Sequence, residues 1–69
     1  MMDIVLNGKK HAVPDGATLA ALLRESKITD TTDGIAVAVN ASVVPRRRWE
    51  EVHLRAGDTV EVIHAVQGG

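Results

Sequence analysis

A short amphipathic segment near residue 20 is the feature that most limits what this chain can fold into. Leu19, Leu22 and Leu23 fall at positions i, i+3 and i+4, so a helix would place all three on one face. Thr18 is the expected N-cap of this helix, with Asp15 as its rival. The pattern lasts for roughly two to three turns, and an isolated helix that short is only marginally stable in water. Its leucines therefore need a sheet to cover them.

Short β-prone runs on both sides of this segment can supply the sheet. Before the helix, the runs 3–6 and 10–13 are separated by Asn7-Gly8, a strong signal for a two-residue hairpin. After the helix come the runs 35–39 and 43–44 and a last run that begins at Thr59. This order predicts a two-layer α+β domain with one helix over one small sheet, but it does not fix the order of the strands.

The composition limits how such a domain is stabilised. The chain has 69 residues and no cysteine, which excludes disulfides, thiolate metal sites and iron–sulfur clusters. Stability must come from an apolar core, and the 45% of hydrophobic residues are mostly Val, Ala, Leu and Ile. We therefore expect one domain of marginal to moderate stability.

The charge balance and hydropathy exclude several classes of partner. With 8 basic and 9 acidic residues and a single aromatic side chain, the chain lacks the charge and the stacking surface of a nucleic-acid binder. No apolar run approaches the ~20 residues that a membrane span needs. The N-terminus lacks the pattern of a secretory signal. We expect a cytoplasmic protein with no nucleic-acid or membrane partner.

No group of residues predicts catalysis or metal binding within the chain. The three histidines do not have the spacing of metal ligands, and neither serine has recognisable base and acid partners. The basic run 46–48 is typical of a solvated charge cluster, although it could attract an acidic surface or a phosphate. We therefore predict no catalytic residue, no metal and no bound cofactor.

The last strand runs directly into Gln67, Gly68 and Gly69. Two terminal glycines have no packing use, because glycine buries almost nothing and loses the most backbone freedom when it is ordered. A frayed end is one explanation. The other is that a flexible tail, residues 67–69, threads a narrow site in a partner and presents its carboxylate there, while residues 1–66 form the domain. We favour the second explanation.

The strand before the tail has two different faces. Val60 and Val62 share one face, and Ile63 lies on the opposite face and should be exposed. Together with Ala65 and Val66 it would form a small apolar patch that leads to the tail. Such a patch predicts a partner-docking surface.

The residues that suggest a family are spread over nearly the whole chain. They are Leu6-Asn7-Gly8, Ala17-Thr18-Leu19 with Leu22-Leu23, Ala36-Val37-Ala38-Val39-Asn40, Val43-Val44-Pro45-Arg46 with Trp49, Leu54, Gly57-Asp58, Val60-Glu61 and Ala65-Val66-Gln67-Gly68-Gly69. In this order and at this length, the chain resembles the ThiS-type sulfur carriers of thiamin biosynthesis. The resemblance implies a ubiquitin-like β-grasp fold, in which a ββαββ mixed sheet is crossed by one helix.

The resemblance also implies a reaction at the C-terminal glycine. In that family, a partner similar to ubiquitin-activating enzymes, a ThiF-type adenylyltransferase, uses ATP to adenylate this carboxylate. Sulfur from a cysteine desulfurase relay then replaces the adenylate, and the thiocarboxylate supplies a ThiG-type thiazole synthase. Here the sulfur-carrying residue would be Gly69, the threading tail would include Gln67 and Gly68, and the chain would be a protein cosubstrate rather than an enzyme.

Other functions on the same fold stay open from the sequence. They are a sulfur carrier for molybdopterin synthesis or tRNA thiolation, a ubiquitin-like modifier joined to lysines, and an interaction module without chemistry. The sequence departs from the family at Asn40-Ala41, where Asn-Gly is common. Because alanine disfavours positive φ, we expect a longer or differently shaped turn through Ser42.

Overall fold

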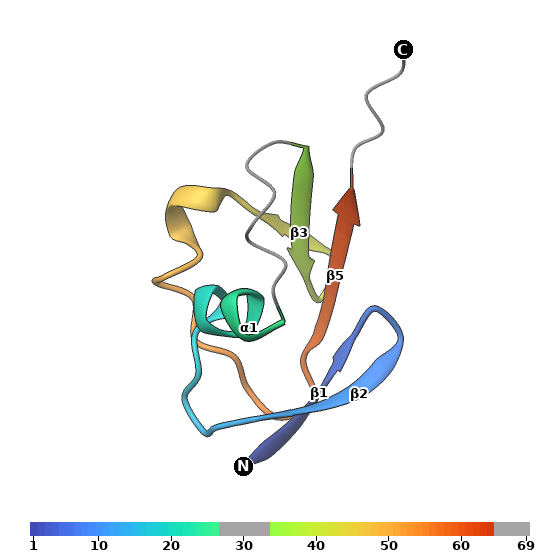
Figure 1. Cartoon of the computed structure of the whole chain (residues 1–69), viewed down its shortest axis with the longest axis vertical. Helices are drawn as coiled ribbons and strands as arrows, with labels where there is room; N and C mark the ends of the chain where they lie inside the picture. The colour runs from blue at the N-terminus through green and yellow to red at the C-terminus, as the bar shows by residue number, and fades with distance from the viewer. Residues whose placement is uncertain (27–33, 65–69) are drawn as a thin grey trace.

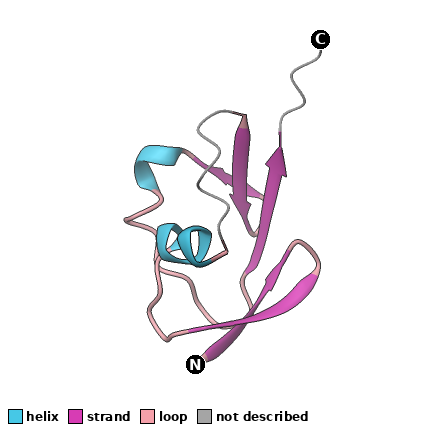
Figure 2. Cartoon of the chain, in the orientation of Figure 1, coloured by secondary structure: helices cyan, strands magenta, loops and turns pink. Residues whose placement is uncertain are grey.

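The computed structural model describes residues 1–26 and 34–64, which form one sheet with a helix packed across it (Figure 1). In chain order the elements are β1 (Met2–Leu6), β2 (Lys9–Val13), α1 (Leu19–Glu25), β3 (Ile35–Val39), β4 (Ser42–Val44), the 3-10 turn η1 (Arg46–Arg48) and β5 (Thr59–His64). Figure 2 shows that α1 and η1 lie on the same side of the strands. This arrangement confirms the predicted α+β class.

The strand that comes last in the chain lies in the middle of the sheet. The strand order is β2-β1-β5-β3-β4. β5 runs parallel to β1 and antiparallel to β3, while both hairpins are antiparallel, so the sheet is mixed as expected. β5 therefore joins the N-terminal hairpin to the β3–β4 hairpin.

The helix begins and packs as its sequence predicts. Thr18 is the N-cap, since its hydroxyl accepts a hydrogen bond from the backbone N–H of Ala21 at 3.1 Å. Leu19, Leu22 and Leu23 are each at most 1% exposed, and they pack against the sheet. At about 1.5–3 kcal/mol for each fully buried leucine, this contact stabilises a helix that would not form alone.

Apolar side chains from every layer close the core. The buried cluster consists of Ile4, Val13, Leu19, Ala20, Leu22, Leu23, Val37, Trp49, Leu54, Val60 and Val62. Trp49 is only 5% exposed, and its indole N–H donates to the backbone carbonyl of Val44 at 2.9 Å. The one aromatic ring thus fills the core beside η1, and its single polar atom is satisfied.

The expectation for the second hairpin was wrong. Val39 pairs directly with Ser42, so the turn contains only Asn40 and Ala41. Both residues have positive φ, 50° and 71° respectively, which is what a two-residue type I′ turn requires. Alanine is therefore held in a conformation that it disfavours.

The side chain of Asn40 explains why the short turn persists. Its Oδ1 accepts the backbone N–H of Thr59 at 3.0 Å, and its Nδ2 donates to Asp58 at 3.0 Å. Its own backbone N–H donates to the carbonyl of Thr59 at 2.7 Å. These bonds fix the turn against the start of β5, and their stabilisation offsets the strain at Ala41.

Candidate functional site: the central strand and its exit

Burial alternates along β5, as the sequence predicted. Val60 is fully buried and Val62 is 9% exposed, and both face the core. Glu61 and Ile63 are exposed, and 57% of the Ile63 surface is accessible. The strand thus has one face that stabilises the domain and one that is free to contact another molecule.

Ile63 has apolar neighbours on the open face of the sheet. It pairs across the strands with Ala36, which is exposed, and Ala38 on the same strand pairs with Val43. Directly opposed residues project from the same face, so these side chains share the open face with Ile63. Val43 is 71% exposed. We call Ala36, Val43 and Ile63 the open-face patch.

Two members of the open-face patch were not singled out from the sequence. Ala36 and Val43 belong to β3 and β4, and the register of this hairpin decides which side of the sheet each side chain projects from. The available signal was the alternation of large and small residues in 35–39, which favours alanines on the side away from the helix. Val43 could be added only after its pairing with Ala38 was known.

The other predicted site residues lie outside the described part of the chain. They are Ala65, Val66, Gln67, Gly68 and Gly69. Their predicted roles in docking, threading and sulfur transfer stay predictions. The last described residue before them is His64, at the end of β5.

The hairpin between β1 and β2 holds β5 shortly before this exit. The backbone N–H of Asn7 donates to the carbonyl of Val60 at 2.9 Å. The side-chain Oδ1 of Asn7 then accepts the N–H of Val62 at 2.8 Å. This one residue therefore makes two successive bonds to the central strand, the second across 55 positions of sequence.

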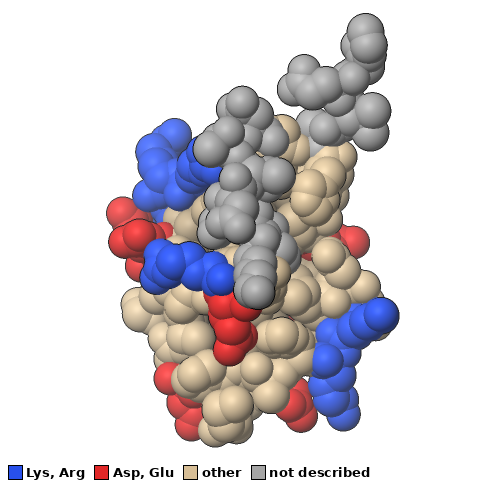
Figure 3. All heavy atoms as spheres, viewed as in Figure 1, with Lys and Arg blue, Asp and Glu red and all other residues tan. Residues whose placement is uncertain are grey.

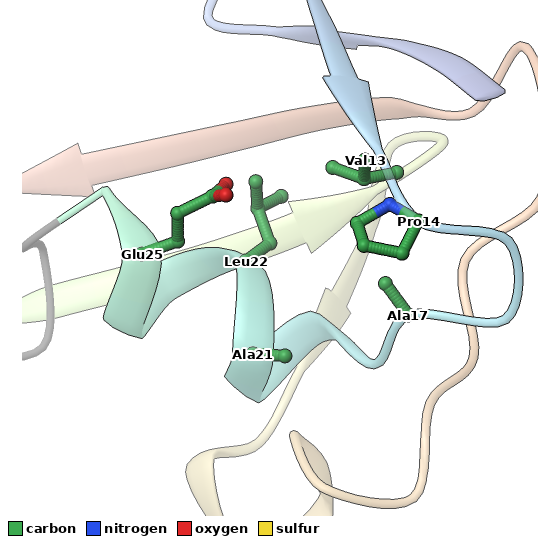
Figure 4. A pocket seen from close by; sticks show the side chains of 6 residues that line it. All are labelled: Val13, Pro14, Ala17, Ala21, Leu22 and Glu25. Carbon is green, nitrogen blue, oxygen red and sulfur yellow. The ribbon is translucent and has the colours of Figure 1, made fainter. Parts of the chain in front are cut away.

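A small hollow lies between the end of β2 and the helix, away from the open face (Figure 4). Its volume is about 220 Å³, and its lining residues are Val13, Pro14, Ala17, Ala21, Leu22 and Glu25. The Glu25 carboxylate at its rim lies 3.2 Å from Nε2 of His11. The lining is apolar apart from this carboxylate, so the hollow does not bring together groups for acid–base or nucleophilic chemistry.

Charged side chains of both signs alternate over the face shown in Figure 3. Arg24 lies 3.7 Å from Glu50, and Arg48 lies 3.6 Å from Glu51. The Arg46 guanidinium sits 5.5 Å from the centre of the Trp49 ring, a cation–π distance. Within the basic run, Arg48 thus has a neighbouring carboxylate and Arg46 lies over the Trp49 ring, and all three arginines are exposed, as in a solvated charge cluster.

Within residues 1–26 and 34–64, no three His, Asp or Glu side chains gather in a way that could hold a metal ion. In the same ranges, no helix is long and apolar enough to cross a membrane.

Comparison with known proteins identifies the family of the chain. The family model described as "ThiS family" matches residues 3–69. The chain belongs to the ThiS family. A solved relative of this family, the crystal structure of a thiamine biosynthesis protein (ThiS) from Geobacter metallireducens, superposes with a TM-score of 0.84 at 26% identity. That match covers 99% of this chain and 100% of the other, and it confirms the predicted ubiquitin-like β-grasp fold.

Two curated relatives match almost the whole of this ThiS-family chain. The sulfur carrier protein ThiS of Escherichia coli is 28% identical over 68 residues, which is 99% of this chain and 100% of the relative. A thiazole synthase of Magnetococcus marinus is 37% identical over 68 residues, again 99% of this chain. The chain spans only 20% of the length of that thiazole synthase.

Proposed function

We propose that this chain is a sulfur carrier protein that supplies sulfur for the thiazole moiety of thiamin. The observation that carries the proposal is that the match to the ThiS family runs from residue 3 through Gly69. The full-length similarity to a sulfur carrier protein and the similarity to a thiazole synthase support the same pathway. In this proposal the chain is a cosubstrate for other enzymes, not an enzyme itself.

The proposed reaction takes place on the carboxylate of Gly69. A carboxylate is a poor electrophile, so one of its oxygens first attacks the α-phosphorus of ATP and pyrophosphate leaves. The terminal sulfur of a persulfide from the desulfurase relay then attacks the carbonyl carbon of the acyl-adenylate, and AMP leaves with the original oxygen. A thiol reductant cleaves the resulting acyl disulfide at its S–S bond and is itself oxidised to a disulfide with the relay cysteine. The product is a thiocarboxylate. Because the chain has no cysteine, no thiol of its own can carry the sulfur instead.

Three partners follow from this chemistry. A ThiF-type adenylyltransferase uses the ATP, a cysteine desulfurase relay provides the sulfur, and a ThiG-type thiazole synthase accepts it. We propose that Gln67 and Gly68 thread the active sites of these enzymes, and that Gly68, which has no side chain, fits the narrowest part of the channel. The open-face patch, continued by Ala65 and Val66, is the proposed docking surface. The cytoplasmic location stays a prediction.

Intact-mass analysis of protein from cells that make thiamin tests the proposal. We expect a species in which one oxygen of the C-terminus is replaced by sulfur. Deleting Gly69 should abolish this species, although the shortened chain still ends in a glycine carboxylate, because the reacting carbon no longer reaches the active site. The matched control is Gly69→Ala, which keeps the length and adds one methyl group, and which should retain part of the reaction.

Two outcomes would contradict the proposal. One is the recovery of only unmodified or lysine-conjugated protein under conditions in which thiamin is made. The other is normal thiocarboxylate formation on the chain that lacks Gly69, since that would place the reaction elsewhere.

A further inference from the structure

The hydrogen bond between Asn7 and Val62 extends the sheet beyond the end of β1. β1 and β5 pair in parallel at Val5 with Thr59 and at Leu6 with Val60. In a regular parallel ladder the bonds are evenly spaced, so the next one would join the N–H of Val62 to the backbone carbonyl of Asn7. Asn7 has already entered the turn, with a φ of 50°. Its side-chain Oδ1 receives the Val62 N–H instead, at 2.8 Å.

The side-chain amide oxygen of Asn7 therefore takes the place of its backbone carbonyl as the acceptor. This is the last hydrogen bond that the structure gives on the side of β5 that pairs with β1. Past Val62, the described pairing of β5 is with β3 alone, through Ile63 with Ala36 and His64 with Ile35. The Asn7 bond thus comes one residue before Ile63 and two before the end of the described strand. It fixes the path of β5 where the chain leaves the domain.

Few residue types can do this at position 7. The turn requires positive φ, which glycine and asparagine adopt most easily. The bond to Val62 requires a short side chain with an acceptor. Glycine meets only the first requirement, whereas asparagine and aspartate meet both.

We propose that Asn7 is a positioning residue for the reaction at Gly69. This inference rests on the proposed function. Asn7 is distant in sequence from the reacting carboxylate and acts through Val62, by holding the exit of β5 in one direction. A strand fixed in this way presents the following residues to the adenylyltransferase in fewer conformations, so less conformational entropy is lost when the carboxylate reaches the reacting geometry.

Asn40 provides a matched control for this role. It occupies the same position of the other hairpin turn, also has a φ of 50°, and also accepts a backbone N–H of β5 through its Oδ1. Its partner is Thr59 at the start of β5, far along the strand from the exit. Asn7→Gly and Asn40→Gly each keep the turn conformation, and each removes a side-chain acceptor for a backbone N–H at one end of β5. Asn40→Gly also removes the bond from Nδ2 to Asp58.

Steady-state ATP–pyrophosphate exchange with the ThiF-type adenylyltransferase tests the role of Asn7. For Asn7→Gly we expect kcat to fall by about two- to tenfold, the range that the loss of one hydrogen bond allows, with KM nearly unchanged. Asn7→Asp, which keeps the acceptor, should restore kcat. Asn40→Gly should lower the stability of the domain but leave kcat as in the wild type.

Amide hydrogen exchange of the free protein is the second measurement. In Asn7→Gly the Val62 amide should exchange faster while Thr59 stays protected, and Asn40→Gly should give the reverse. This measurement does not depend on any partner.

The outcomes separate the inference from the proposed function. An equal loss of kcat in both glycine variants, an unchanged kcat in Asn7→Gly, or a failure of Asn7→Gly to fold would each overturn the positioning role. If the wild-type protein supported no ATP–pyrophosphate exchange by the adenylyltransferase, that result would overturn the proposed function, and the positioning role with it. In that case the hydrogen-exchange pattern would still report whether Asn7 holds Val62.

Discussion

At the scale of single residues, two asparagines combine a turn conformation with a bond to the central strand. Asn7 and Asn40 both open two-residue hairpin turns with positive φ, and each accepts an N–H from β5. Asparagine tolerates this backbone conformation, and its short amide reaches neighbouring backbone groups. The two hairpins are thereby fixed to the strand that lies between them.

Ala41 carries strain that a single substitution should relieve. Its φ of 71° disfavours any residue with a Cβ. Ala41→Gly removes a strain penalty of roughly 1–2 kcal/mol from the folded state. It also makes the unfolded chain more flexible, which lowers stability by roughly 0.4–1 kcal/mol. We expect a net increase of about 0.5–1 kcal/mol in the free energy of unfolding, measured by chemical denaturation.

The matched control for this prediction is Ala21→Gly, the same substitution within a helix. It should lower stability by about 1 kcal/mol. If Ala41→Gly were destabilising to the same degree, the positive φ would not be a source of strain.

The second hairpin shows why a turn is hard to predict from its own residues. Judged alone, Asn40-Ala41 is unsuited to a tight turn, and that judgement gave the wrong geometry. The bonds that stabilise it come from Asp58 and Thr59, nearly twenty positions away (the sequence separations are 18 and 19). Local sequence rules cannot include them.

At the scale of elements, β5 has one buried face that stabilises the domain and one exposed face that we propose as part of a docking surface. We expect Ile63→Asp to lower the rate of thiocarboxylate formation with the purified partners, because a charge in an apolar interface must be desolvated without a partner. The fold should be retained, since Ile63 is 57% exposed and lies outside the core cluster. The control is Ile63→Leu, which keeps the apolar area and should react normally. An unchanged rate in Ile63→Asp would remove Ile63 from the docking surface.

The positions of the helix and strands in the chain were largely predictable, but which strands pair with each other in the sheet was not. The spacing of Leu19, Leu22 and Leu23 and the cap at Thr18 define the helix locally. The parallel pairing of Val5 with Thr59 joins residues from opposite ends of the chain, and no local pattern encodes it. The resemblance to a known fold supplied only the expectation of a mixed sheet, and the structure gives the pairing.

At the scale of the whole molecule, the small core leaves little stability to lose. A domain of 69 residues has roughly 3–10 kcal/mol of stability at typical values per residue. Leu23→Ala should cost about 2–5 kcal/mol, because this side chain is completely buried. We expect the variant to be close to unfolding at room temperature, with its guanidinium midpoint shifted strongly downwards.

Trp49 gives a direct measurement of this effect. It is the only tryptophan and is 5% exposed, so its fluorescence should report the loss of the core in one transition. Val43→Ala is a suitable control, because it removes apolar atoms from a side chain that is 71% exposed and should change the midpoint little. Equal shifts in the two variants would contradict the assignment of the core.

The candidate site was predictable to different depths. The exposure of Ile63 followed from alternation along β5 and is confirmed by the structure. The role proposed for Gly69 came from the resemblance to a family, because a glycine has no side chain whose type or environment could indicate chemistry. The bond from Asn7 to Val62 was missed, since a hairpin signal explains Asn-Gly completely without reference to a distant strand.

The central place of β5 has a mechanical consequence. A force applied along the chain beyond His64 pulls this strand lengthwise between β1 on one side and β3 on the other. The backbone hydrogen bonds on both sides lie across the direction of pull, so they resist together in shear. An edge strand peeled from a sheet would instead lose its bonds one at a time. If, as proposed, an enzyme draws the end of this chain into its active site, it pulls on the strand that the fold holds from both sides.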